Sequence, residues 1–169
     1  MNQNLLKSML EYSPESGLFI WIKNKGRGEN GSIAGYKEAK GYIQIKINQV
    51  GYKAHRLAWL YMTGDFPILQ IDHINRIKDD NRWENLRLAT PSENQRNKIM
   101  PSGISGFRGV VQHCNKWRAQ IKDGYGRQKI IGLFDDKKDA AIAYDKEAKI
   151  LHGDFAVLNF KHCESSVNS

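Results

Sequence analysis

Four polar residues near the middle of the chain have the types and spacing that hydrolysis of a phosphate ester requires. Asp72 and His73 are adjacent, Asn85 follows His73 by 12 residues (73 to 85), and Asn94 follows Asn85 by nine (85 to 94). Carboxylate and amide oxygens are hard ligands that suit Mg²⁺ or Mn²⁺. An imidazole titrates near neutrality, as a general base for water should. The set therefore predicts a metal-dependent phosphodiesterase site, with Asp72 and Asn94 as ligands and His73 as the base.

Two strands and a loop are predicted around the Asp-His pair. A short strand over 69–73 ends in Asp72 and His73, a polar loop spans 75–84, and a second strand spans 86–89. Neighbouring residues of a strand point to opposite faces, so the strand end must twist or bulge if both side chains are to serve one site.

A helix is predicted to carry the last residue of the set. Thr90 and Glu93 have the spacing of a capping box, and Pro91 stands at the first helical position. The helix would bring Asn94 toward the strands. Asn85, at the far side of the loop, is expected to hydrogen-bond the backbone near His73 and so to hold its ring.

Further cations near the set have less specific interpretations. Arg87, Arg96 and Lys98 are candidates to position phosphates, although a solvated helix face accounts equally well for the last two. His55 precedes the set, and a packing role or a phosphate contact is favoured over catalysis for it.

The composition indicates a polyanionic partner. The chain has 169 residues and a formal net charge of +8, with an isoelectric point of about 9.5. Nucleic acid is the commonest partner of so basic a protein. A basic protein with no nucleic-acid role is the alternative.

The cysteines and the apolar segments indicate the cellular compartment in which the protein is expected. Cys114 and Cys163 are far apart and form no CxxC pair, so neither structural zinc nor a disulfide framework is expected. No signal peptide or run of about 18 apolar residues is found. We expect a protein of the cytoplasm, the host's cytoplasm if a phage encodes it, with no membrane partner.

Residues 1 to about 64 are predicted to fold into a short helix, several strands and a second helix. Apolar spacing and alternation predict, in chain order, a helix near 5–10, a strand over 18–22, a loop over 24–35, a strand over 41–47, a turn at 48–51, a strand over 52–54 and a helix over 55–62 that Gly64 ends.

The C-terminal part is predicted to be a sheet with one helix. A linker spans 99–106, three short strands fall within 107–134, and a helix runs from Asp135 or Asp136 to Gly153, followed by a frayed end at 162–169. Residues 101–134 hold six bases and one acid, whereas 135–169 hold five bases and seven acids. The positive charge therefore belongs to the sheet, which is a candidate surface for DNA; a solvated strand face is the alternative.

The N-terminal motifs resemble those of the HNH endonuclease family, in its phage and intron-encoded branch. They are HRLA at 55–58, IDHIN at 71–75, DNRWENLR at 80–87 and SENQRN at 92–97. The resemblance covers about residues 10–98 and implies a nuclease domain over 1–98 with a ββα-metal core over 55–98. It implies one divalent ion, Mg²⁺ or Mn²⁺, held by Asp72 and Asn94, with His73 as base and Asn85 as the orienting residue. Such enzymes leave 5′-phosphate and 3′-hydroxyl ends.

One segment departs from the family pattern. The loop reads Asn75-Arg76-Ile77-Lys78 where many relatives carry a Gly-Asn or Gly-Asp turn. The departure changes a loop and not a catalytic role.

The C-terminal motifs resemble the DNA-binding domain of plant ethylene-responsive transcription factors, the APETALA-like type. They are FRGV at 107–110, KWRA at 116–119, IGLF at 131–134, AAIAYD at 140–145, HG at 152–153 and AVLNF at 156–160. The resemblance implies a domain over 107–161, a three-stranded antiparallel sheet packed on one helix, whose sheet enters the major groove. Arg108 matches a family arginine that contacts DNA. The other residues expected to contact DNA lie on the matching strands: Trp117, Arg118, Lys122 and Lys129. Val111 and His113 stand where the plant pattern has arginines, so the plant sequence preference is not expected.

Three functions for the whole chain follow. The first is a site-directed endonuclease on double-stranded DNA, in which the N-terminal part cuts and the C-terminal sheet sets the target. It would act as a monomer or a homodimer, and a single site would nick one strand. The second is a DNA-binding regulator with an inactive nuclease domain. The third is an RNA-acting or structural basic protein, which the lack of evident aromatic stacking surfaces disfavours.

Overall fold

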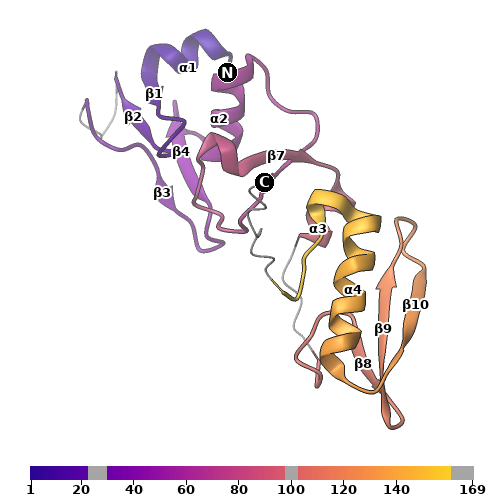
Figure 1. Ribbon diagram of the computed structural model, residues 1–169. Coiled ribbons are helices and arrows are strands. Elements are labelled where there is room, and N and C mark those ends of the chain that lie inside the picture. Colours follow the sequence, from indigo (N-terminus) through magenta and orange to yellow (C-terminus); the bar gives the residue numbers. More distant parts are fainter. Residues whose placement is uncertain (23–29, 98–102, 161–169) are drawn as a thin grey trace, which may run out of the picture. The chain divides into compact units, whose positions relative to one another are not determined.

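The computed structural model describes residues 1–22, 30–97 and 103–160. The chain divides into two compact units, Met1–Asn94 and Gln95–Ser169 (Figure 1). Both mix helices with antiparallel sheets, so the α+β class predicted from the sequence is confirmed. Part of the expected linker (99–102) and the expected frayed tail (162–169) lie outside the described residues. None of the helices in the described ranges has the length and apolar character to cross a membrane.

The N-terminal unit begins with a helix that runs directly into a hairpin. Helix α1 (Gln3–Met9) is capped by the Asn2 side chain, which accepts from the Leu5 amide. Strand β1 (Leu10–Tyr12) follows at once and pairs antiparallel with β2 (Phe19–Trp21). Strand β1 was not predicted, because three residues are too few for a periodic signal.

A three-stranded sheet and a helix complete the first half of the unit. Strands β3 (Tyr36–Lys37), β4 (Ile43–Ile47) and β5 (Val50–Lys53) pair in the order β3-β4-β5. Asn48 and Gln49 both have positive φ, of 48° and 67°, as the two central residues of a tight hairpin turn often do. Helix α2 (Ala54–Thr63) follows β5 directly and ends at Gly64, whose φ of 98° gives the left-handed C-cap predicted for it.

The second half of the unit is a hairpin followed by a short helix. Strand β6 (Gln70–His73) pairs antiparallel with β7 (Leu86–Ala89), and the 3₁₀ turn Trp83–Asn85 leads into β7. Helix α3 (Pro91–Arg96) comes next. The predicted capping box forms: the Thr90 amide donates to Glu93 Oε2 at 2.8 Å, and the Glu93 amide donates to Thr90 Oγ1 at 3.3 Å.

One apolar core joins these elements. Its buried residues come from α1, the β1–β2 hairpin, the segment before β3, β4, α2 and the β6–β7 hairpin. They are Leu6, Leu10, Tyr12, Phe19, Trp21, Ala34, Ile45, Ile47, Ala54, Leu57, Ala58, Leu60, Ile71 and Leu86. The β6–β7 hairpin is therefore anchored to the rest of the unit through apolar side chains next to the predicted site residues.

The C-terminal unit is a three-stranded antiparallel sheet with one long helix. The sheet has the order β10-β9-β8, from β8 (Val110–His113), β9 (Lys116–Lys122) and β10 (Gln128–Phe134). Helix α4 (Lys137–His152) starts at Asp136, whose side chain accepts from the Lys138 amide, and the 3₁₀ turn Gly153–Phe155 follows it. Ala119, Ala140 and Ala141 are fully buried between helix and sheet. Because their side chains are small, the helix and the sheet approach closely.

Candidate functional site

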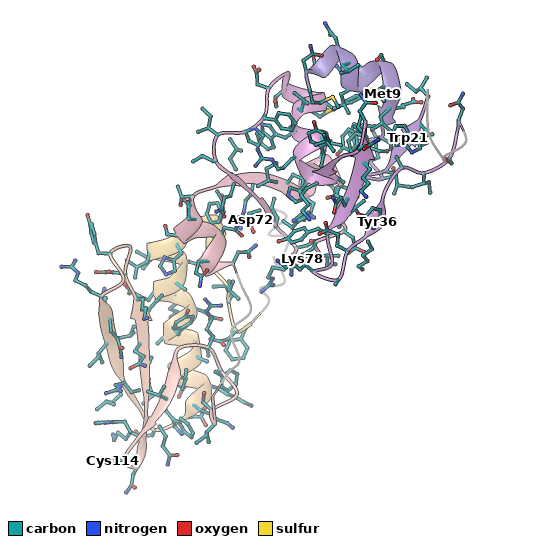
Figure 2. All side chains as sticks on the ribbon, turned by 180° about the vertical axis from the view of Figure 1, so that it is seen from behind. Met9, Trp21, Tyr36, Asp72, Lys78 and Cys114 are labelled. Atoms are coloured by element: carbon teal, nitrogen blue, oxygen red, sulfur yellow. The ribbon has the colours of Figure 1, made fainter. Side chains whose placement is uncertain are left out.

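Asp72 and His73 stand at the end of β6, and both are 5% exposed. The pairing with β7 is continuous, with Asp72 opposite Arg87 and His73 opposite Leu86, so of the two expected alternatives, a twist or a bulge, the bulge is not present here. Because strand side chains alternate, the two groups meet different neighbours. Figure 2 labels Asp72 on this hairpin.

The Asp72 carboxylate is paired with Arg87 across the hairpin. Arg87 Nε and Nη2 each lie 2.9 Å from Asp72 Oδ2. The side chains are only 15% and 6% exposed, so the guanidinium compensates a carboxylate that has little access to water. The sequence had suggested Arg87 for a phosphate, and the structure adds this contact with Asp72.

The His73 imidazole is held from one side by an amide. Asn81 Oδ1 lies 3.3 Å from His73 Nε2. The other end of the same amide donates to the Asp79 carbonyl at 3.2 Å, which fixes the oxygen toward the imidazole. Since an amide oxygen can only accept, His73 Nε2 is the donor in this contact and carries a proton.

Aromatic rings enclose His73. The His55 ring meets it edge-on at 5.2 Å between centroids, and the Tyr42 ring lies 6.0 Å away. Burial lowers the pKa of His73 below its ordinary value, opposed by the hydrogen bond with Asn81 and the nearby carboxylates of Asp72 and Asp80. A neutral ring at pH 7 can accept a proton.

His55 is buried without a hydrogen bond at one nitrogen. Its Nδ1 has no partner among the described residues. Burial, with the charges of His73, Arg56 and Lys53 adding to it, lowers the pKa of His55 to about 3. The ring is therefore neutral and packs between Tyr42 and His73, in line with the packing role favoured from the sequence.

Asn85 joins both ends of the loop that follows His73. Its Oδ1 accepts from the Asn75 amide at 2.9 Å, and its Nδ2 donates to the Asp80 carbonyl at 2.7 Å. Its own carbonyl accepts from the Ile74 amide at 2.9 Å. These bonds fix the backbone directly after the imidazole.

An ion-pair network stiffens the same loop. Asp80 accepts from Arg82 Nε at 2.9 Å and Nη2 at 2.7 Å, and from Asn75 Nδ2 at 2.6 Å. The hydrogen bonds from Arg82 lower the pKa of Asp80 to about 2. Arg76 adopts a positive φ of 67°, a backbone conformation that glycine adopts more readily than other residues.

Asn94 lies on the side of β6 that carries Asp72. Its Nδ2 donates to Gln70 Oε1 at 2.6 Å. Gln70 precedes Asp72 by two residues, so their side chains share one face of the strand. This bond engages the amide nitrogen of Asn94, and the amide oxygen takes no part in it.

The donor chemistry fits a weakly bound hard cation. The described residues contain no group of three or more His, Cys, Asp or Glu side chains able to hold a metal ion. One carboxylate and one amide, from Asp72 and Asn94, would leave most positions of an Mg²⁺ or Mn²⁺ shell to water and phosphate oxygens. Of the other candidates here, the Arg96 side chain and Lys98 lie outside the described residues.

Two residues of the site were not predicted from the sequence as functional. Asn81 is 2% exposed and contacts His73, and Tyr12 Oη donates to the Asn81 carbonyl at 2.7 Å. A polar residue in a polar loop gives no periodic signal of burial. Asn81 falls inside the DNRWENLR motif, and its place in that motif was the one feature of the sequence that could have indicated a functional role.

In the C-terminal unit, strand alternation separates the predicted DNA-binding residues into two sets. Arg118 and Lys122 project from the face opposite α4, because Ala119 and Ile121 between them are buried against the helix. The Arg118 Nε is shielded from solvent without a partner among the described residues.

Trp117 and Lys129 lie on the helix side of the sheet. Trp117 packs against the core around Ala140, and Lys129 Nζ lies 2.7 Å from Glu147 Oε1 of α4. The basic-sheet interpretation placed all four residues on one surface. In the structure, Trp117 and Lys129 lie on the opposite face of the sheet from Arg118 and Lys122.

Arg108 is tied to the helix and to the C-terminal segment. Its Nε donates to Tyr144 Oη at 3.1 Å, and its amide donates to Asn159 Oδ1 at 2.6 Å. Asn159 is held by the buried Asp145, which accepts from the Asn159 amide at 2.8 Å and from the Phe160 amide at 2.9 Å. Cys114, which is exposed, lies in the turn between β8 and β9 (Figure 2).

Comparison with known proteins separates the same two parts. Residues 52–96 match the family model described as HNH endonuclease. An uncharacterized HNH endonuclease of Acanthamoeba polyphaga mimivirus is 34% identical over 108 residues, which cover 62% of this chain and 56% of the viral protein. The chain thus spans little more than half of that relative.

The C-terminal part is similar to plant transcription factors. The APETALA2-like protein 2 of Oryza sativa subsp. indica is 41% identical over 69 residues, 40% of this chain and 16% of the rice protein. An ethylene-responsive transcription factor of Arabidopsis thaliana is 40% identical over 68 residues, 39% of this chain and 27% of that protein. Both resemblances drawn from the sequence are thereby confirmed.

A solved structure gives a wider but weaker match. It is titled as DNA binding and cleavage by the HNH homing endonuclease I-HmuI. It superposes with a TM-score of 0.46 and 20% identity, covering 84% of this chain and 80% of that one.

Proposed function

We propose that this protein is an HNH-type DNA endonuclease that hydrolyses phosphodiester bonds of double-stranded DNA. The observation that carries the proposal is the joint position of Asp72, His73 and Asn94. The first two end β6, and the third contacts Gln70 on the same strand, all within the segment that matches the HNH endonuclease model. The match supports a nuclease.

His73 is the general base. Asn81 holds the His73 ring, and the imidazole takes the proton from a water molecule as the water oxygen bonds to phosphorus. The bond from phosphorus to the 3′ oxygen breaks, and that oxygen gains a proton from solvent. The products are a 5′-phosphate and a 3′-hydroxyl end. The lowered pKa of the buried ring keeps it ready to accept the proton at neutral pH.

Asp72 and Asn94 are the residues that would hold a divalent ion, Mg²⁺ or Mn²⁺. When bound, the ion would supply positive charge to the scissile phosphate and to the leaving oxygen. Arg87 holds the Asp72 carboxylate in one orientation, and Asn85 holds the loop after His73. Since a neutral amide is a weak ligand, ion binding in the absence of DNA is expected to be weak.

The sheet of the C-terminal unit is the proposed targeting surface. Arg118 and Lys122 project from its outer face, and the similarity to plant transcription factors supports duplex DNA as the partner. An arginine can read a guanine edge with two hydrogen bonds, whereas a lysine more often contacts phosphate. Arg108 remains a proposed DNA contact because it matches an arginine of the resembled family that contacts DNA. Trp117 and Lys129 are assigned to packing on the helix side.

Strand scission on cloned genomic DNA from the source and its relatives tests this function. The purified protein is incubated with Mg²⁺ or Mn²⁺, with and without EDTA, and the ends are mapped. Metal-dependent cuts with 5′-phosphate and 3′-hydroxyl ends support the proposal. Tight duplex binding without scission would support instead a DNA-binding regulator whose nuclease domain is silent.

A further inference from the structure

Asn81 makes two contacts that connect the N-terminal hairpin to the proposed base. Its side-chain oxygen meets His73 Nε2 at 3.3 Å, and its backbone carbonyl accepts from Tyr12 Oη at 2.7 Å. Both contacts are buried, and Asn81 itself is 2% exposed. A displacement of the Asn81 backbone would therefore move the oxygen that faces the imidazole.

The turn of the β1–β2 hairpin contacts the same loop at two further points. The Trp83 amide donates to the Pro14 carbonyl at 2.9 Å. Gly17 has a φ of 73°, and a Cβ there would lie 2.4 Å from both the Asn81 carbonyl carbon and the Arg82 amide nitrogen. These are backbone atoms, so the approach is open only to glycine.

The hairpin is itself well anchored. Tyr12 pairs with Phe19 in the strand register, their rings lie 4.7 Å apart, and they are 4% and 2% exposed. The turn is closed by bonds from the Ser13 amide to the Leu18 carbonyl at 3.0 Å and from the Gly17 amide to the Ser13 carbonyl at 2.8 Å. Burial raises the pKa of the Tyr12 phenol far above its ordinary value, so the hydroxyl remains a donor.

We propose that the β1–β2 hairpin positions the catalytic imidazole: Tyr12 and Gly17 fix the backbone of Asn81, and Asn81 then fixes the orientation and tautomer of His73. The hairpin lies outside residues 52–96, so this is a contribution of the chain's own N-terminal segment to the site. The proposal rests on the proposed function in that His73 is taken as the base.

The first test reads the imidazole directly, in the full-length protein without DNA or metal. The protein is labelled with ¹⁵N-histidine, and the His73 signals are assigned with His73→Gln. Tyr12→Phe removes one hydroxyl and keeps the ring. Tyr61→Phe is the matched control, because Tyr61 packs on Tyr12 at 5.7 Å and its hydroxyl has no hydrogen-bond partner among the described residues.

We expect wild type and Tyr61→Phe to carry the His73 proton on Nε2, and Tyr12→Phe to populate both tautomers. A wild-type His73 protonated on Nδ1, or identical spectra for Tyr12→Phe and Tyr61→Phe, would overturn the proposal. A uniform loss of stability cannot produce the expected difference, since the spectrum is recorded on the folded protein.

The second test measures cleavage separately from binding. Gly17→Ala introduces the clash with the Asn81 backbone. Gly31→Ala is its control, because Gly31 also has a positive φ, of 85°, but no atom lies within 4 Å of a Cβ there. We expect Gly17→Ala and Tyr12→Phe to lose about ten- to a hundredfold in single-turnover rate, with DNA dissociation constants within about twofold of wild type. Rates equal to those of the two controls would contradict the proposal.

The two tests separate this proposal from the proposed function. If wild type does not cleave DNA in any divalent ion, the proposed function fails, and the tautomer comparison still decides whether the hairpin fixes His73. If wild type cleaves and Tyr12→Phe matches Tyr61→Phe in both readouts, the nuclease stands and the positioning role fails.

Discussion

Two nitrogens of Arg87 contact a single oxygen of Asp72 across the β6–β7 pair: Nε donates a hydrogen bond at 2.9 Å, and Nη2 forms an ion pair at 2.9 Å. Because both side chains are largely buried, the guanidinium is the compensating charge for the proposed metal ligand. The Asp72 carboxylate therefore has a fixed orientation in the protein without metal. This pairing makes stability and the proposed catalysis depend on the same two side chains.

Removing Arg87 should destabilise the N-terminal unit strongly. Arg87→Ala leaves Asp72 buried without its partner, which costs about 3–5 kcal/mol of unfolding free energy. Urea unfolding measures it. The control is Lys37→Ala, which breaks an ion pair with Asp79 whose side chains are 58% and 34% exposed; such a pair contributes about 1 kcal/mol or less. Equal losses in the two variants would show that the Asp72 pair is no stronger than a surface one.

Stability of the N-terminal unit should fall in mild acid because of His55. Burial lowers its folded pKa to about 3, whereas the unfolded value is 6.5. The unfolded chain therefore binds the proton first, so the contribution is complete above pH 6.5 and is lost as pH falls toward 3. The limiting slope is about 1.4 kcal/mol per pH unit.

His55→Phe isolates this contribution. The variant keeps an aromatic ring between Tyr42 and His73 and removes the titrating group. Unfolding free energy measured from pH 7 to pH 4 in EDTA should fall less steeply than for wild type. His73 acts in the same direction, since its pKa is also lowered, so a residual slope is expected. Parallel curves for the two proteins would contradict the buried, neutral state assigned to His55.

Asn94→Ala should abolish cleavage and spare DNA binding, because it removes one of the two protein oxygens proposed for the ion. Gln70→Ala is a milder variant for comparison, since it keeps the Asn94 oxygen but removes the 2.6 Å hydrogen bond that orients the Asn94 amide. We expect Gln70→Ala to need a higher Mg²⁺ concentration for half-maximal cleavage. Calorimetric DNA affinity should be unchanged in both. Normal cleavage by Asn94→Ala would refute the ligand role.

Two lysines of the C-terminal sheet should differ in their effect on DNA binding. Lys122 projects from the outer face, whereas Lys129 pairs with Glu147 on the helix side. Lys122→Ala should weaken binding and reduce the slope of log affinity against log salt by about 1. Lys129→Ala should leave that slope unchanged. The reverse result would mean that DNA meets the sheet from the helix side or at its edge.

Arg118→Ala should change sequence preference as well as affinity. Arg118 is on the outer face, and its Nε lacks a partner among the described residues. If it reads a guanine, the variant loses about 1–3 kcal/mol of discrimination at one base pair. Selection from a randomised duplex library compares its site with that of wild type. An unchanged consensus sequence would indicate that Arg118 contacts the DNA backbone and does not read a base.

Local signals account for the elements that were predicted correctly. Thr90 and Glu93 are three residues apart and form the capping box that their spacing indicated. Gly64 takes the left-handed conformation expected where α2 ends. Such features depend on neighbouring residues alone, so one sequence is sufficient to find them.

Contacts between distant segments could not be predicted in this way. Tyr12 and Asn81 are 69 residues apart, and only the folded hairpin brings the hydroxyl to the carbonyl. The face of the sheet to which a side chain points is also not predictable from neighbouring residues alone. Trp117 and Arg118 are adjacent, so alternation places them on opposite faces. Only the burial of Ala119 shows which face meets the helix.

The most direct test of the account compares single-turnover DNA cleavage by wild type and His73→Ala, at saturating protein and Mg²⁺. We predict that wild type cleaves and that the variant is slower by about 10²- to 10⁴-fold, with its DNA dissociation constant within about twofold of the wild-type value. Cleavage by His73→Ala at the wild-type rate would contradict the role of His73. Failure of wild type to cleave any duplex in Mg²⁺ or Mn²⁺ would contradict the nuclease itself.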